Sequence, residues 1–211
     1  HGLFIDGVWR SSKNGALFES VNPATGEVLG RFALGEEEDV SLAVEAAEGA
    51  LAGWRTTPAP RRGEIILRAA SILRERKEEL GKVVTREMGK IISEGLGDVQ
   101  EAIDFLEYIA GEGRRLLGET TPSELPEKFA MTVRHPIGVV GAITPWNFPI
   151  AIPSWKIGAA LITGNTIVFK PATLTPLGAV EFVRAFEEAG LPPGVLNLVT
   201  GSADPVGRAI V

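Results

Sequence analysis

Residues 138–170 read GVVGAITPWNFPIAIPSWKIGAALITGNTIVFK, and this stretch decides the fold. Its start belongs to an apolar, β-rich run over residues 137–143, which is typical of a parallel strand buried on both faces. Pro145 and Pro149 then frame a loop, because proline cannot donate to a strand ladder. Residues 151–162 are apolar and long enough for a helix, and residues 166–170 form a second apolar run. The pattern predicts a βαβ unit with a right-handed crossover.

Polar loops follow both predicted strands. Residues 144–147 come directly after the first strand, and residues 170–173 close the second. In an open parallel sheet, ligands bind in the crevice beyond the carboxyl ends of the strands. The two loops are therefore expected to meet at one edge of the sheet and to form a binding site there.

The composition excludes several classes of site. The 211 residues include no cysteine, which rules out disulfides, thiolate metal sites and a cysteine nucleophile within this chain. The two histidines, His1 and His135, are too few for an imidazole metal site, so no metal is expected. A net charge of −6 argues against a nucleic-acid or anionic-membrane surface. No apolar run approaches the length of a membrane span, and a cytoplasmic protein is expected.

The rest of the chain extends the same α/β pattern. Edge strands are expected over residues 3–9 and 28–32, separated by turn residues. Helical patterns begin at residues 36, 60, 82, 98 and 176, and a further strand is expected over residues 195–199. The predicted fold class is therefore α/β, a parallel sheet with helices on both faces.

Residues 119–136 differ in character from their surroundings. They are polar, are broken by Pro122 and Pro126, and end in an alternating stretch over residues 129–134. The pattern predicts an extended β arm or hairpin that projects from the domain. A long edge strand is normally covered by a partner, which favours an oligomer contact, but an ordinary surface hairpin fits the pattern equally well.

The last predicted helix opens at Asp204 or Pro205 and runs to Val211 without a C-cap glycine or a returning strand. We expect the chain to be a fragment of a longer protein, or one part of a split protein.

Three motifs carry a family resemblance. They are the loop TPWNFP over residues 144–149, the pair Trp155-Lys156, and Phe169-Lys170-Pro171-Ala172. At these positions, and along nearly the whole chain, the sequence resembles the NAD(P)-dependent aldehyde dehydrogenase superfamily. The resemblance implies a Rossmann-like fold and the oxidation of an aldehyde to a carboxylic acid through a thiohemiacetal and a thioester. It also implies a homo-oligomer, a dimer or tetramer, for the full-length protein.

The resemblance implies three domain segments. Residues 1–118 match the N-terminal part of the cofactor-binding domain, and residues 137–211 match its βαβαβ core, incomplete at the C-terminus. Residues 119–136 match an oligomerisation arm.

The resemblance also implies roles near the substrate. Asn147 matches the asparagine whose side-chain amide faces the oxyanion, whereas a loop asparagine that bonds its own backbone is the alternative. Lys156 matches a lysine assigned to a proton relay in some members, although a helix lysine is more often a solvated charge. Phe148, Ile152 and Trp155 match positions that line the substrate tunnel, and core packing is their alternative.

NADP or NAD is the implied cofactor, although no G-x-G-x-x-G fingerprint follows Ile143. Lys170 matches the lysine that binds the ribose hydroxyls. Thr173 stands where members committed to NAD often carry a glutamate; it supplies a donor and no charge to repel a 2′-phosphate, so NADP is expected to be tolerated. The implied cofactor-binding residues are Ile143, Thr144, Pro145, Trp146, Asn147, Lys170, Pro171, Ala172, Thr173, Ala203 and Gly207. For most of residues 201–207, a plain strand-to-helix turn is the favoured alternative.

The family's cysteine nucleophile and its glutamate base belong to motifs downstream of Val211. This chain alone is therefore expected to be inactive. The alternative is a non-catalytic nucleotide-binding or assembly module that pairs with a separate C-terminal chain. The IPSWKI segment resembles bacterial 2-oxoglutaric-semialdehyde and general aldehyde dehydrogenases, but Trp155 stands where some semialdehyde enzymes carry an arginine. An aldehyde that carries an acid group therefore remains a possible substrate.

Overall fold

The computed structural model describes all residues, 1–211, and is built around a parallel three-stranded core. Strand β7 (Val139–Ile143) leads through α5 (Ala151–Ile162) to β8 (Thr166–Lys170), and α6 (Pro176–Glu188) leads on to β9 (Leu196–Leu198). Strand β8 pairs in parallel with both β7 and β9. The predicted βαβ unit is therefore confirmed, with α5 and β8 at the expected residues.

An antiparallel hairpin completes the main sheet, whose order is β2-β1-β9-β8-β7. The expected edge strand over residues 3–9 is in fact two strands, β1 (Leu3–Ile5) and β2 (Val8–Arg10). Asp6 and Gly7 both have positive φ, 53° and 74°, and turn the chain back on itself between them. Because β1 runs antiparallel to β9, the sheet is mixed rather than wholly parallel.

The other expected edge strand lies outside the main sheet. It is β4 (Val28–Ala33), which pairs with β3 (Leu17–Val21) in a separate two-stranded sheet. The strand expected over residues 28–32 is therefore confirmed, and it is an edge strand of this small sheet.

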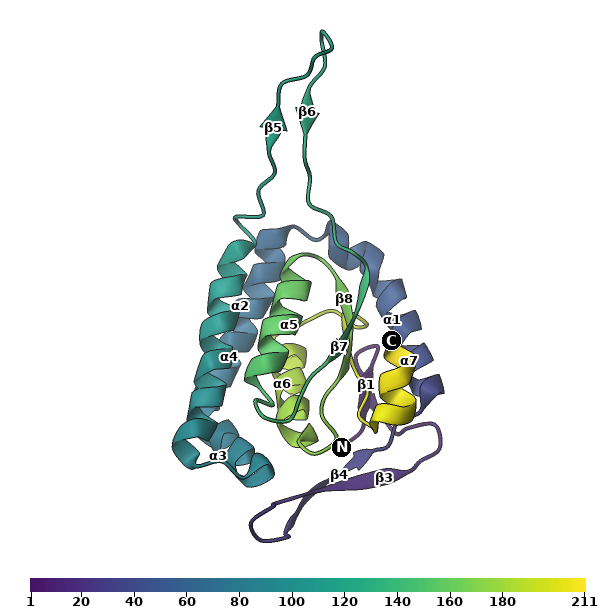
Figure 1. Cartoon of the computed structure of the whole chain (residues 1–211), viewed down its shortest axis with the longest axis vertical. Coiled ribbons are helices and arrows are strands. Elements are labelled where there is room, and N and C mark those ends of the chain that lie inside the picture. The colour runs from purple at the N-terminus through teal and green to yellow at the C-terminus, as the bar shows by residue number, and fades with distance from the viewer.

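Helices cover both faces of the main sheet (Figure 1). Every residue of β8 is buried, and alternate side chains point to opposite faces. Ile167 and Phe169 pack in the larger core, which draws on α2 (Ala59–Glu75), α4 (Ile92–Glu112), α5 and α6. Val168 packs on the other face, against residues of α1 (Glu37–Thr56). Burial of each large apolar side chain stabilises the fold by roughly 1.5–3 kcal/mol.

Strand β7 was expected to be buried on both faces, and this is wrong. It is the edge strand of the sheet, and only Ala142 within it is buried. The strand buried on both faces is β8, which has a neighbour on each side.

Helix α4 begins at Ile92 rather than at residue 98. Gly95 and Gly97 explain the difference. In the sequence they suggest a break before the helix, but in the structure Gly95 lies inside the helix, where α4 packs closely against a neighbouring helix. A Cβ on Gly95 would lie 2.5 Å from the carbonyl oxygen of Gly81 in α3 (Lys77–Met88). Glycine is needed there so that α3 and α4 can approach each other.

Residues 119–136 project from one end of the body as a long hairpin (Figure 1). It contains the short strands β5 (Thr120–Thr121) and β6 (Ala130–Met131). The β3–β4 sheet lies at the opposite end of the molecule (Figure 1).

The chain closes with a short helical segment, η1 (Ala203–Gly207) followed by α7 (Arg208–Ile210). Val206 and Ile210 pack on the α1 face of the sheet. None of the helices combines the length and the apolar character needed to cross a membrane.

Candidate active site

The loops that follow β7 and β8 begin side by side. Ile143 pairs with Lys170 in the parallel register, and the backbone N–H of Thr144 donates to the carbonyl oxygen of Lys170 at 3.1 Å. The Thr173 hydroxyl donates to the carbonyl oxygen of Gly201, which follows β9, at 2.8 Å. The carboxyl ends of all three parallel strands thus form one continuous rim.

The Lys170 side chain lies in this rim and is 4 % exposed. Its Nζ donates to the carbonyl oxygen of Pro171 at 3.1 Å and forms no ion pair, so one of its three donors is used within this chain. Burial lowers the pKa of Lys170 from its ordinary value. Gly207 lies alongside, where a Cβ would sit 3.8 Å from Cδ and Cε of the lysine. A buried ammonium with free donors fits a ligand rich in hydroxyl or phosphate oxygens.

Asn147 is half-buried in the loop that follows β7. Its backbone carbonyl accepts a hydrogen bond from Lys90, but its side-chain amide makes none. The alternative in which this asparagine bonds its own backbone is therefore not what the structure adopts. The amide donors are free to meet an oxygen of a bound molecule.

Two cavities flank the loop that carries Asn147, and Trp146 lines both. The first, of about 530 Å³, is lined from both rim loops and from β3, by Phe18, Glu19, Ser20, Val21, Pro23, Glu87, Met88, Trp146, Thr173, Leu174 and Thr175. The second, of about 440 Å³, is lined by Met88, Lys90, Glu94, Gly97, Asp98, Trp146, Asn147 and Phe148. The rim loops therefore share a hollow surface with the segment that joins α3 to α4.

Of the remaining residues predicted near the substrate, Phe148 precedes α5, and Ile152, Trp155 and Lys156 lie within it. Phe148 lines the second cavity, whereas Ile152 and Trp155 are half-buried and line neither. Lys156 is exposed and also lies outside both cavities.

The remaining predicted cofactor residues lie along the rim or just beyond it. Ile143 and Pro145 are exposed on the β7 side, Pro171 is buried and Ala172 half-buried after β8, and Ala203 is exposed at the start of η1. The hydroxyl of Thr173 was expected to supply a donor to the cofactor, but its hydrogen is already engaged by Gly201. The hydroxyl oxygen can still accept a hydrogen bond, and the side chain carries no negative charge.

Glu87 is a member of this region that the sequence pattern missed. It is 3 % exposed and accepts hydrogen bonds from the Ser20 hydroxyl at 2.8 Å and from the backbone N–H groups of Leu177 and Gly178 at 2.7 and 3.0 Å. Those N–H groups belong to the first turn of α6, where a carboxylate is favoured. Burial nevertheless raises the pKa of Glu87 to about 7, against the lowering effect of these hydrogen bonds.

Lys90 and Asp98 were also missed. Both lie beside the loop of Asn147, and each bonds to its backbone, Lys90 at Asn147 and Asp98 at Ala151. Their partners lie 57 and 53 residues further along the chain, so local patterns carry no signal for them.

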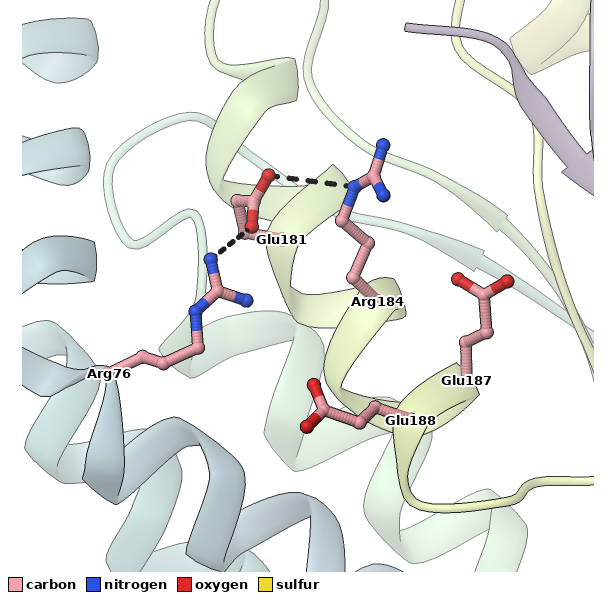
Figure 2. Close-up of a pocket in the computed structure, with 5 residues that line it drawn as sticks. All are labelled: Arg76, Glu181, Arg184, Glu187 and Glu188. Carbon is pink, nitrogen blue, oxygen red and sulfur yellow. Dashed lines mark hydrogen bonds and ion pairs between the residues drawn. The ribbon is translucent and has the colours of Figure 1, made fainter.

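A separate pocket of about 430 Å³ shares no lining residue with the rim and lies between α6 and Arg76, at the end of α2. Figure 2 shows that charged side chains alone surround it, with Glu181 bonded to Arg76 at 2.6 Å and to Arg184 at 3.6 Å. Glu181 thus pairs with both arginines of the pocket, and Glu187 accepts a hydrogen bond from Trp9 at 2.8 Å, so these charges already have partners within the chain. This pocket is therefore a weaker candidate for the functional site than the rim.

Comparison with known proteins agrees with this arrangement. Residues 9–211 match the model of the aldehyde dehydrogenase family. The alpha-ketoglutaric semialdehyde dehydrogenase of Bacillus subtilis is 44% identical over 208 residues, which are 98% of this chain and 43% of that protein. The chain thus spans less than half the length of this relative.

Solved structures give the same result. An NADP-dependent enzyme of E. coli superposes with a TM-score of 0.96 at 38% identity, over 99% of this chain and 43% of that one. PnpE in complex with nicotinamide adenine dinucleotide superposes with a TM-score of 0.96 at 36% identity, over 100% of this chain and 43% of that one.

Proposed function

Because this chain belongs to the aldehyde dehydrogenase family, we propose that the protein to which it contributes oxidises an aldehyde to a carboxylic acid with NAD(P)⁺. The observation that carries the proposal is the shared rim, where the loop of Asn147 and the side chain of Lys170 start from paired residues of β7 and β8. One loop would serve the reacting carbonyl and the other the cofactor.

Asn147 would stabilise the oxyanion. When a nucleophile adds to the aldehyde carbon, an electron pair of the carbonyl double bond moves onto the oxygen. A side-chain amide already aimed at that oxygen stabilises the charge without reorganisation, and such a donor lowers the barrier by roughly 3–4 kcal/mol. The free amide of Asn147 supports this role.

Lys170 would hold the ribose of the cofactor. Its buried ammonium retains two donors beyond the bond to Pro171, which suits a pair of ribose hydroxyls. Gly207 leaves room beside the lysine stem. The other rim residues named from the resemblance would line the same cofactor site, and bound NAD(P)⁺ would supply the hydride acceptor for the reaction.

The nucleophile must come from outside these 211 residues, because they contain no cysteine. In the proposed reaction a cysteine thiolate adds to the aldehyde, hydride leaves the same carbon, and water then cleaves the thioester to release the acid and regenerate the thiol. Aldehyde, NAD(P)⁺ and water are consumed, and carboxylate, NAD(P)H and protons are formed. A separate glutamate would take the proton of that water.

We propose a semialdehyde that carries a carboxylate as the substrate class, on the similarity to the Bacillus subtilis enzyme. Phe148, Ile152 and Trp155 would contribute to the tunnel by which it enters, and Lys156 would take part in proton transfer.

The hairpin arm is proposed to bind a second copy of the chain. Phe129, Met131 and Val133 expose apolar side chains on it, at 74, 61 and 57 %. A partner strand or surface would cover this row.

The proposal is tested with the full-length protein and a panel of aldehydes with each cofactor. We expect NAD(P)H to form with alpha-ketoglutaric semialdehyde, and more slowly with an uncharged aldehyde of similar length. If no aldehyde yields NAD(P)H with either cofactor, the proposed function is wrong.

A further inference from the structure

The loop that carries Asn147 has little backbone bonding of its own. Pro145, Pro149 and Pro153 have no N–H to donate. After the bond from Thr144 to Lys170, the next backbone hydrogen bond is that from Ile152 to Phe148, at 3.2 Å. The backbone of residues 145–147 therefore depends on groups from elsewhere in the molecule.

Lys90 supplies one such group. It follows Gly89, which ends α3 in the left-handed conformation, and its Nζ donates to the carbonyl oxygen of Asn147 at 2.9 Å. The same ammonium lies 4.1 Å from the centroid of the Phe148 ring, within the range of a cation–π contact. Lys90 thus contacts both the backbone of Asn147 and the next side chain.

Asp98 supplies the second group, four residues further along the chain, at Ala151. It is fully buried within α4, and its Oδ1 accepts the backbone N–H of Ala151 at 2.7 Å. Ala151 is the first residue of α5, and a carboxylate is favoured at the N-terminus of a helix. The other oxygen, Oδ2, makes no hydrogen bond.

The positive charge of Lys90 also acts on Asp98. Burial raises the pKa of Asp98 to about 6, while the Ala151 N–H and the Lys90 ammonium oppose that rise. Both side chains line the same cavity as Asn147. The side chains of Lys90 and Asp98 therefore interact electrostatically. They bond to the backbone at two residues four positions apart, Asn147 and Ala151.

We propose that Lys90 and Asp98 are positioning residues, which fix the backbone at Asn147 and at Ala151, four residues later, so that the free side-chain amide of Asn147 is held in one orientation. The inference rests on the proposed function of Asn147 as the oxyanion donor. A donor held rigidly costs no reorganisation during the reaction, whereas a loosened loop would lose that advantage. Lys90 and Asp98 act through Asn147 and are not proposed to touch the substrate.

The first test needs no activity and measures backbone hydrogen exchange over residues 146–152 in the full-length protein. The variants are Lys90→Met, Lys90→Arg and Asp98→Ala, with Lys82→Met as the matched control on an exposed position of α3. We expect roughly fivefold faster exchange or more in Lys90→Met and Asp98→Ala, and near-native exchange in Lys90→Arg and Lys82→Met. Native exchange in Lys90→Met would overturn the proposal.

The second test is a double-mutant cycle on kcat. Lys90→Met should lower kcat by about tenfold or more, with the aldehyde KM and the cofactor Kd changed by less than about twofold. In the Asn147→Ala background, Lys90→Met should lower kcat by less than about twofold, because no amide remains to be positioned. If the two losses multiply, Lys90 acts independently of Asn147 and the proposal is wrong.

The two tests separate the inference from the function on which it rests. Wild-type protein that oxidises no aldehyde would refute the proposed function, while hydrogen exchange would still decide whether Lys90 and Asp98 hold the loop. Active protein with multiplying losses would refute the inference alone.

Discussion

The backbone N–H of Thr144 donates a hydrogen bond to the carbonyl oxygen of Lys170 at 3.1 Å. This bond continues the ladder between β7 and β8 by one step past the last residue pair, Ile143 and Lys170. It sets the point at which the two loops separate, so that Asn147 and the Lys170 ammonium lie at the same end of the sheet. Parallel strands bring their carboxyl ends together in this way, and the site depends on it.

Loss of the Lys170 ammonium should weaken cofactor binding. We expect Lys170→Met to raise the Kd of the cofactor by roughly 10- to 100-fold, since hydrogen bonds to charged groups contribute about 1.5–3 kcal/mol. Lys156→Met, on an exposed position of α5, is the matched control and should leave the Kd unchanged. Equilibrium titration of the full-length protein checks this, and equal effects of the two substitutions would contradict it.

Cofactor preference should respond to charge at Thr173. Thr173→Glu places a carboxylate in the rim, which can accept from ribose hydroxyls and repels a 2′-phosphate. We expect the ratio of kcat/KM for NADP to that for NAD to fall by about tenfold or more. Leu174→Glu puts the same charge on the adjacent exposed residue and should change the ratio far less. An unchanged ratio in Thr173→Glu would show that residue 173 does not face the ribose.

The buried Glu87 should make stability depend on pH. Its pKa is raised from 4.5 to about 7 in the folded protein, so the folded state holds the proton more tightly than the unfolded state. The contribution of Glu87 to the free energy of unfolding is therefore fully present below pH 4.5. It falls as the pH rises from 4.5 towards 7 and stays lower at higher pH. Glu87→Gln does not titrate and lacks this slope.

We expect the wild type to lose roughly 2 kcal/mol of unfolding free energy relative to Glu87→Gln between about pH 5 and pH 8. Urea unfolding of both full-length proteins at the two pH values measures the difference. Parallel pH curves for the two proteins would mean that the Glu87 carboxyl is not perturbed.

The hairpin arm should control assembly. Phe129→Glu puts a charge into the exposed apolar row of the arm, and we expect it to shift the full-length protein to smaller species at micromolar concentration. Lys128→Gln changes the neighbouring exposed residue without adding a buried charge and should leave the assembly intact. Light scattering after size exclusion measures the mass, and an unchanged mass in Phe129→Glu would place the interface elsewhere.

Local patterns predicted the parts of the fold whose determinants are local. Prolines, the Gly164-Asn165 turn and apolar runs delimit α5 and β8 at the expected residues. The pattern of residues 28–32 predicted an edge strand, but it could not say that β3 is its partner. The start of α4 was missed because Gly95 serves a close contact with Gly81 and not a turn.

The same distinction holds at the rim. Asn147 and Lys170 could be predicted as site residues because Asn147 follows a recognisable strand, Lys170 ends one, and both lie in family motifs. Glu87, Lys90 and Asp98 could not be predicted, since each bonds to backbone groups 50 or more residues away. An isolated charged residue within a helix, like Glu87 and Asp98, or between two helices, like Lys90, is more often a solvated charge.

The central claim, that Asn147 serves the carbonyl while Lys170 serves the cofactor, is tested most directly by Asn147→Ala in the full-length protein. We expect kcat to fall by about 10²–10³-fold while the Kd of the cofactor stays within about twofold of the wild type. A kcat within about threefold of the wild type, or a parallel loss of cofactor affinity, would contradict the account.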